Sequence, residues 1–229
     1  MADAARAVAH VEPHPTSTGT DNRKLLMWIF LGSECLLFGA LIASYLIFRG
    51  EPSSYEAIVD GVRTFLPPHD QIIDGVEYEG ILDLPVTSQS TFVLLMSSLS
   101  MALAVYGARH NRLTMMKGWL LATVLLGLTF LGYQIVEFRS FGQEGLNLGV
   151  NQFGASFFLL TGTHGTHVAV GVIYLLSLLA TASFRRDGMG PEQGLIVETA
   201  GLYWHFVDAV WIVIFTVIYL IPVEVLSTP

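Results

Sequence analysis

Hydrophobic residues fall into five long blocks along the 229 residues of this chain, with short polar stretches between them. A helix rises about 1.5 Å per residue, so about 20 apolar residues cross a hydrocarbon core of about 30 Å. Each block reaches that length, and the Pro, Asp, Arg and Asn that a spanning helix avoids gather in the gaps. The pattern predicts an all-α integral membrane bundle of five transmembrane helices, at 25–48, 86–108, 114–138, 153–182 and 197–221.

The second block is the least hydrophobic of the five. Its apolar residues are diluted by Ser88, Gln89, Ser97, Ser98 and Ser100. Small hydroxylated side chains are common where helices pack closely in a membrane. We therefore expect this block to span the membrane in spite of its polar residues.

Basic residues are distributed unevenly among the segments that connect the blocks. The N-terminus and the second and fourth connections hold eight Lys and Arg, whereas the first and third connections hold three. This bias predicts a cytoplasmic N-terminus and, with five spans, a C-terminus outside. Residues 1–24 are expected to form a flexible cytoplasmic arm, followed by a membrane domain over 25–222. The first block is too long for the apolar region of a signal peptide.

Composition excludes several classes of protein. Apolar residues make up 52% of the chain and charged residues 13%, far fewer charges than in a typical soluble domain. A net charge of −8 without any basic stripe argues against nucleic-acid binding. The single cysteine, Cys35, excludes an internal disulfide and any site built on a pair of cysteines.

The first connection, 49–85, is the longest segment between two blocks, and it is acidic. It is expected to lie outside the membrane, where its charge would steer a basic soluble partner by long-range attraction. The alternative is a solvated loop without a partner. Eight carboxylates carry the charge: Glu51, Glu56, Asp60, Asp70, Asp74, Glu77, Glu79 and Asp83.

Ionisable residues inside the blocks are costly and need a partner or a purpose. Glu34 lies near the middle of the first block without a positive neighbour in sequence, so its carboxyl is favoured in the neutral form and is a candidate for proton relay. His164 and His167 share one helix face, as do His205 and Asp208, and the two pairs lie at similar depths. They are expected to form one buried polar cluster, or else to be satisfied pairwise as hydrogen bonds between helices.

Two further features concern the third and fourth blocks. Glu137 forms a polar patch with Tyr133 and Gln134 near the end of the third block. Several glycines thin one face of the fourth block, so that another backbone can approach it closely and the helix can lie centrally in the bundle. These glycines are Gly154, Gly162, Gly165 and Gly171.

Most catalytic motifs are absent from the sequence. There is no phosphate-binding glycine loop, no Gly-x-Ser-x-Gly and no His-Glu-x-x-His. An independent membrane metalloenzyme using His164, His167, His205 and Asp208 stays an alternative on residue type alone. A small transporter with Glu34 as its coupling carboxylate is another, although no internal repeat supports it.

Two motifs suggest a family. The run Gly162-Thr163-His164-Gly165-Thr166-His167-Val168 is followed about 40 residues later by Tyr203-Trp204-His205-Phe206-Val207-Asp208. Together with the stretch Gly32-Ser33-Glu34, they resemble subunit III of the haem–copper respiratory oxidases. The resemblance covers about residues 23–222. It departs from the family at Thr166, where leucine is usual, and in the long acidic connection.

The resemblance implies an accessory subunit of an aa3-type oxidase in the bacterial cytoplasmic membrane. Such a subunit holds no haem or metal of its own, and packs against catalytic subunit I and copper-bearing subunit II, where haem and copper are expected. Glu34 then supports proton uptake, and bound phospholipid contacts Arg185 or Arg186. A polar bundle core is implied for His164, His167, His205, Asp208 and Glu137.

The resemblance leaves the electron donor of the complex open. The acidic connection favours cytochrome c, because cytochromes that dock on such oxidases are basic. The alternative is a quinol oxidase, since these enzymes also carry such a subunit.

Overall fold

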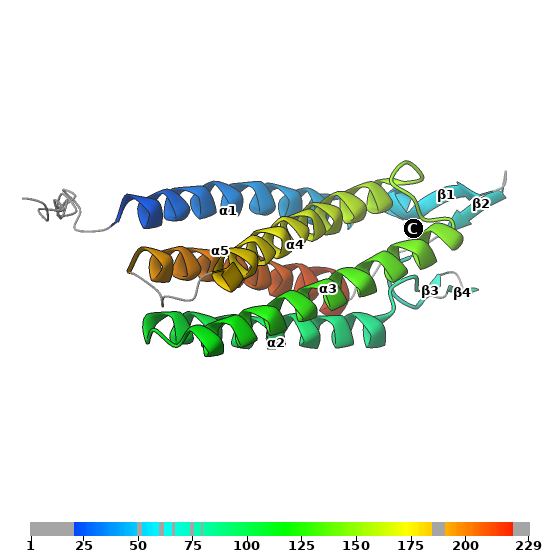
Figure 1. Cartoon of the computed structure of the whole chain (residues 1–229). Helices are drawn as coiled ribbons and strands as arrows, with labels where there is room; N and C mark the ends of the chain where they lie inside the picture. The colour runs from blue at the N-terminus through cyan, green and yellow to red at the C-terminus, as the bar shows by residue number, and fades with distance from the viewer. Residues whose placement is uncertain are drawn as a thin grey trace, which may run out of the picture.

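Five long helices dominate the computed structural model of the chain (Figure 1). The structure describes residues 21–49, 52–59, 62–65, 67–73, 76–78, 80–184 and 191–221. Each of the five helices is long and apolar enough to cross a membrane, which confirms the predicted all-α membrane bundle. They are α1 (Asn22–Phe48), α2 (Leu84–Arg109), α3 (Leu113–Gln143), α4 (Gln152–Phe184) and α5 (Pro191–Phe215), which continues as a π-helix over Thr216–Leu220.

The helix ends lie within about six residues of the predicted ones, and side-chain caps explain two of the starts. The Asp21 carboxylate accepts a hydrogen bond from the backbone N–H of Arg23 at 2.8 Å, so α1 begins three residues before the predicted span. Asp83 caps α2 in the same way through Val86. The predicted arm, 1–24, lies outside the described residues up to residue 20.

The connection between α1 and α2 contains secondary structure that the sequence analysis did not predict. A short 3-10 helix is followed by two antiparallel hairpins, at the same end of the bundle as the end of α5 (Figure 1). We call this end of the molecule the connection end. The elements are η1 (Pro52–Tyr55), β1 (Glu56–Val59), β2 (Val62–Phe65), β3 (Gln71–Ile73) and β4 (Val76–Tyr78).

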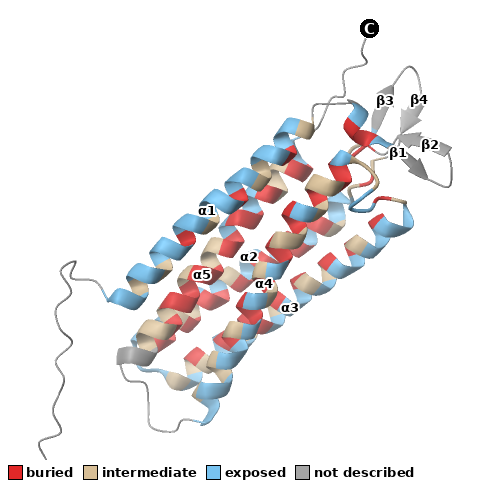
Figure 2. Cartoon of the chain, turned by 90° about the horizontal axis from the view of Figure 1, so that it is seen from above, coloured by how far each residue is buried: buried red, intermediate tan, exposed pale blue. Residues whose placement is uncertain are grey.

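The helices differ strongly in how much of their surface is covered. Helices α2 and α3 form a tight antiparallel pair, and α5 packs on α1, α2 and α4. Helix α4 packs on three other helices, α1, α3 and α5, as predicted for a central helix. In Figure 2, α1 is mostly exposed, while buried positions concentrate where α2 and α5 face the rest of the bundle.

One aromatic side chain explains two of the glycines in the bundle. The indole of Trp204 in α5 lies between α3 and α4, where a Cβ at Gly127 or Gly171 would stand 2.7 Å or 2.9 Å from its ring. The Trp204 N–H points to α2, where it donates a hydrogen bond to the Ser97 hydroxyl at 3.0 Å.

The prediction that the fourth block's glycines admit another backbone is wrong at Gly171 and Gly165, where side chains fill the space, and at Gly162, which nothing approaches within 4 Å. It holds at Gly154, where the backbone oxygen of Asn147 lies close.

Candidate functional site

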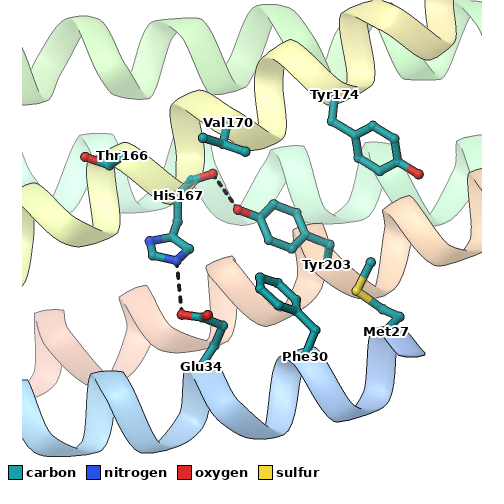
Figure 3. A pocket seen from close by; sticks show the side chains of 8 residues that line it. All are labelled: Met27, Phe30, Glu34, Thr166, His167, Val170, Tyr174 and Tyr203. Carbon is teal, nitrogen blue, oxygen red and sulfur yellow. Dashed lines mark hydrogen bonds and ion pairs between the residues drawn. The ribbon is translucent and has the colours of Figure 1, made fainter. Parts of the chain in front are cut away.

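Glu34 of α1 and His167 of α4 form a hydrogen-bonded pair across the helix interface (Figure 3). The carboxylate Oε2 lies 3.1 Å from the imidazole Nε2. Their side chains are 14% and 18% exposed, so the pair is largely withdrawn from the surface. Glu34 has no positive neighbour in sequence, and the partner that the structure gives it lies 133 residues away in the chain.

The second nitrogen of His167 fixes the proton count of this pair. His167 Nδ1 lies 2.8 Å from the backbone oxygen of Thr163, and a carbonyl can only accept, so Nδ1 carries a hydrogen. The contact between Nε2 and Glu34 then needs one further proton, which belongs either to the imidazole or to the carboxyl. The pair thus holds one exchangeable proton and is neutral overall wherever that proton resides.

A cleft of about 370 Å³ opens beside the pair, between α1, α4 and α5. The hydroxyl of Tyr203 in α5 donates to the backbone oxygen of His167 at 2.9 Å, and its ring stacks on Phe30. The lining is mostly apolar, with Met27, Phe30, Glu34, Thr166, His167, Val170, Tyr174 and Tyr203 around it (Figure 3). The Glu34–His167 pair therefore lies at the wall of an apolar cleft.

The remaining histidines and Asp208 do not form one hydrogen-bonded cluster. His164 is fully buried and donates through Nε2 to the backbone oxygen of Val207 at 3.2 Å. His205 Nδ1 bonds to the Ser98 hydroxyl of α2 at 2.7 Å, while Asp208 has no hydrogen-bond partner among the described residues. Within the described part of the chain, no three His, Cys, Asp or Glu side chains are grouped as metal ligands would be.

Glu137 occupies a buried position at the connection end of α3. One carboxylate oxygen accepts hydrogen bonds from Thr87 of α2 at 2.6 Å and from Tyr219 at 2.9 Å. Gln134 is also buried, and donates to the backbone oxygen of Thr161 in α4 at 2.8 Å. Glu137 and Gln134, expected with Tyr133 in one patch, therefore face different neighbouring helices.

Another set of polar contacts was not predicted from the sequence. Glu198 of α5 binds Lys24 of α1 at 2.6 Å and Arg109 of α2 at 2.9 Å, which joins three helices at the end of the bundle opposite the hairpins. Trp211 donates to Thr91 of α2 at 3.0 Å. The hydroxyl-rich composition of the second block was the available signal for the bonds that α5 makes to α2.

The connection end is held by Arg49, which follows α1. Its guanidinium donates to the backbone oxygens of Val217 and Ile221, where the π-helix ends. Tyr55 donates to the backbone oxygen of Arg49, and burial raises the pKa of Tyr55 to about 12. Burial also lowers the pKa of His69 below its usual value. His69 lines a second cavity of about 450 Å³ together with Tyr219.

Two of the predicted carboxylates in the connection serve local structure. Asp83 caps α2, and Asp70 accepts a hydrogen bond from the backbone N–H of Gly80 at 2.7 Å. Glu56 is exposed. The predicted lipid contacts, Arg185 and Arg186, lie outside the described residues.

Comparison with known proteins identifies the family. The family model described as cytochrome c oxidase subunit III matches residues 6–223. A probable quinol oxidase subunit 3 of Staphylococcus saprophyticus is 35% identical over 198 residues, which cover 86% of this chain and 88% of the relative. The protein of the same description from Staphylococcus aureus is 34% identical over the same shares. The chain therefore belongs to the cytochrome c oxidase subunit III family of the haem–copper oxidases.

Proposed function

We propose that this chain is a non-redox accessory subunit that supports proton uptake by its oxidase complex through Glu34 and His167. Membership of the family makes it a multi-pass protein of the bacterial membrane that associates with other oxidase subunits. Subunit I and the copper-bearing subunit II are the proposed partners, and they would hold the haem and copper. The 3.1 Å contact between Glu34 and His167 is the observation that carries the proposal.

The chemistry of the pair suits proton storage better than redox catalysis. Because the pair is neutral with its proton on either member, it can remain in an apolar environment without an uncompensated charge. The pair borders the mostly apolar cleft, and the hydroxyl of Tyr203 bonds to the backbone of His167 beside it. Assembly support and phospholipid binding, with Arg185 or Arg186 at the head group, belong to the same proposal.

Replacement of Glu34 by glutamine in the intact oxidase tests the proton-uptake role. Glu34→Gln keeps the size of the side chain but removes the exchangeable proton. We expect unchanged haem content and a several-fold loss of turnover or of catalytic lifetime, measured as oxygen consumption over time. Glu144→Gln is the matched control, since Glu144 is exposed at the end of α3. Wild-type activity and lifetime in Glu34→Gln would refute the role.

The proposed orientation places the N-terminus in the cytoplasm and the connection end outside. It is supported by the excess of Lys and Arg in the N-terminus and in the α2–α3 and α4–α5 connections. Labelling of a cysteine introduced at exposed Glu56 with an impermeant reagent tests it. In intact cells, the introduced cysteine should be labelled only if the connection lies outside. Cys35, the native cysteine, is first replaced by serine.

The electron donor has two candidates, each with its own support. Cytochrome c is favoured by the acidic connection, although Asp70 and Asp83 are engaged locally. Quinol is favoured by the names of the Staphylococcus relatives. Turnover of the purified complex with reduced cytochrome c or with a quinol distinguishes them. Activity with cytochrome c that falls steeply with added salt would support the first candidate, and activity with quinol alone would support the second.

A further inference from the structure

Asp208 is a buried carboxyl with no hydrogen-bond partner in the described part of the chain. Its side chain belongs to a residue that is 3% exposed, and neither oxygen makes a hydrogen bond. Buried polar groups in proteins are nearly always hydrogen-bonded, to protein or to water. The surroundings of Asp208 therefore have to supply a partner that the protein atoms themselves do not.

The side chain points toward α2. Trp204 and Trp211, which lie on the same face of α5, donate to the α2 residues Ser97 and Thr91. Ser98 of α2 lies beside Asp208, but its hydroxyl makes its hydrogen bond with His205 Nδ1, at 2.7 Å, and neither Asp208 oxygen has a hydrogen bond of normal geometry. Asp208 thus lies on the side of α5 that faces α2, between two indoles that bond to α2.

No described cation neutralises this carboxyl. The charged residue of α2, Arg109, pairs with Glu198, which lies ten residues before Asp208 and so about 15 Å along the axis of α5. The interior-facing histidines of α4 and the buried carboxylate of α3 each have at least one hydrogen-bond partner. They are His164 and His167 of α4, bound to Val207 and Glu34, and Glu137 of α3, bound to Thr87 and Tyr219.

An ionised Asp208 would be a buried charge without compensation, whereas the neutral acid needs one acceptor for its O–H. We propose that Asp208 is a protonated carboxylic acid that binds a water molecule together with Ser98 and His205. The Asp208 O–H donates to the water, and the water donates to the Ser98 oxygen. The Ser98 O–H donates in turn to His205 Nδ1, so each group has a partner.

This site is separate from the Glu34–His167 pair. Tyr203, which contacts His167, and Asp208 are five residues apart, so they lie about 140° apart around α5. Helix α5 therefore carries one proton-holding site on its α1–α4 side and another on its α2 side. The inference does not depend on the proposed role of Glu34 or on the electron donor.

Infrared spectroscopy of the intact oxidase complex tests the protonated acid. We expect a carboxylic acid C=O band that is lost in Asp208→Asn and retained in Glu34→Gln, which removes the other candidate acid. Exchange into D2O should shift the band. A spectrum that is unchanged in Asp208→Asn would show that Asp208 is ionised and would overturn the proposal.

Removal of the Ser98 hydroxyl tests the water bridge. This variant also keeps the proposal testable if the Asp208→Asn complex does not assemble. Ser98→Ala should shift the C=O band, because the water loses its acceptor. Ser177→Ala is the matched control, since that hydroxyl is exposed and bonds only to the backbone of its own helix. A band that moves neither in Ser98→Ala nor in D2O would mean a dry carboxyl, and would overturn the bound water.

Discussion

Helices α1 and α2 show opposite relations between hydropathy and burial. Helix α1 is the more apolar, yet only 11% of its most apolar 18-residue window is buried inside the chain, against 44% for α2. A helix face in contact with lipid must be apolar, because lipid tails offer no hydrogen-bond partner to a polar side chain. A helix covered by neighbours can carry hydroxyls, and those of α2 bond to its own backbone as well as to neighbouring helices. Hydropathy in these two helices therefore does not follow the extent to which each is buried within the chain.

The two helices are also held by different kinds of contact. Helix α1 buries three side chains that are seven residues apart, Leu31, Phe38 and Tyr45, and adds the ionic contacts of Lys24 and Glu34. Helix α2 instead accepts indole N–H bonds from α5 between close-packed small residues. We expect the α2–α5 contact to depend on shape, and the α1 contact to depend more on charge.

The largest expected effect comes from removing the indole that joins α2, α3, α4 and α5. Trp204→Ala should destabilise the folded chain by about 3–5 kcal/mol, the usual cost of such a cavity. Thermal release of this subunit from the purified complex measures the loss. Trp119→Ala is the control, because Trp119 is 39% exposed and should change the release temperature little. Equal effects of the two variants would contradict the close-packed role of Trp204.

A smaller effect is expected at the ionic contact of α1. Glu34→Gln and His167→Gln should each destabilise the α1 contact, and the double variant should cost less than their sum, with a coupling of about 1–3 kcal/mol. The same thermal release assay measures all four proteins of the cycle. Glu144→Gln with His167→Gln is the control cycle and should be additive. Additivity of Glu34→Gln with His167→Gln would show that the pair contributes no interaction energy.

Loss of a single acceptor on α2 should cost less. Thr91→Val keeps the shape of the side chain but leaves the Trp211 N–H unbonded, at a cost of about 1 kcal/mol. Tryptophan fluorescence during denaturation of the subunit reports the change in stability. Thr129→Val, at an exposed threonine of α3, is the matched control. If Thr91→Val lowers stability no more than Thr129→Val, the indole bond does not stabilise the α2–α5 contact.

The smallest effect is expected at Lys24. Its partly exposed ion pair with Glu198 is worth at most about 1 kcal/mol, and Arg109 remains bound to Glu198 after Lys24→Met. Stability should therefore fall slightly at low salt and match the wild type at high salt. A loss that persists at high salt would show that Lys24 stabilises α1 by packing rather than by charge.

The helices could be predicted from the sequence because each spans lipid by its own composition. Glu34 lies on the same side of α1 as Lys24, Leu31, Phe38 and Tyr45. The side of the helix to which its carboxyl points could therefore also have been inferred. Its partner could not, since nothing local selects His167 over His164 or His205. The hairpins were missed although Asp60-Gly61 and Asp74-Gly75 stand between their paired strands, a typical hairpin sequence.

The position of α5 has a consequence for biogenesis. Since α5 leaves the ribosome after α1 and α2, its polar partners on those two helices enter the membrane before it. The side chains of these two helices that bond to α5 include Lys24 of α1, and Thr91, Ser97 and Ser98 of α2. A chain that stops before α5 therefore lacks the side-chain contacts that join α1 and α2 to it, although Ser97 and Thr91 keep hydrogen bonds to the backbone of α2. We expect such truncated chains to be degraded by membrane quality control rather than to accumulate as a four-helix intermediate.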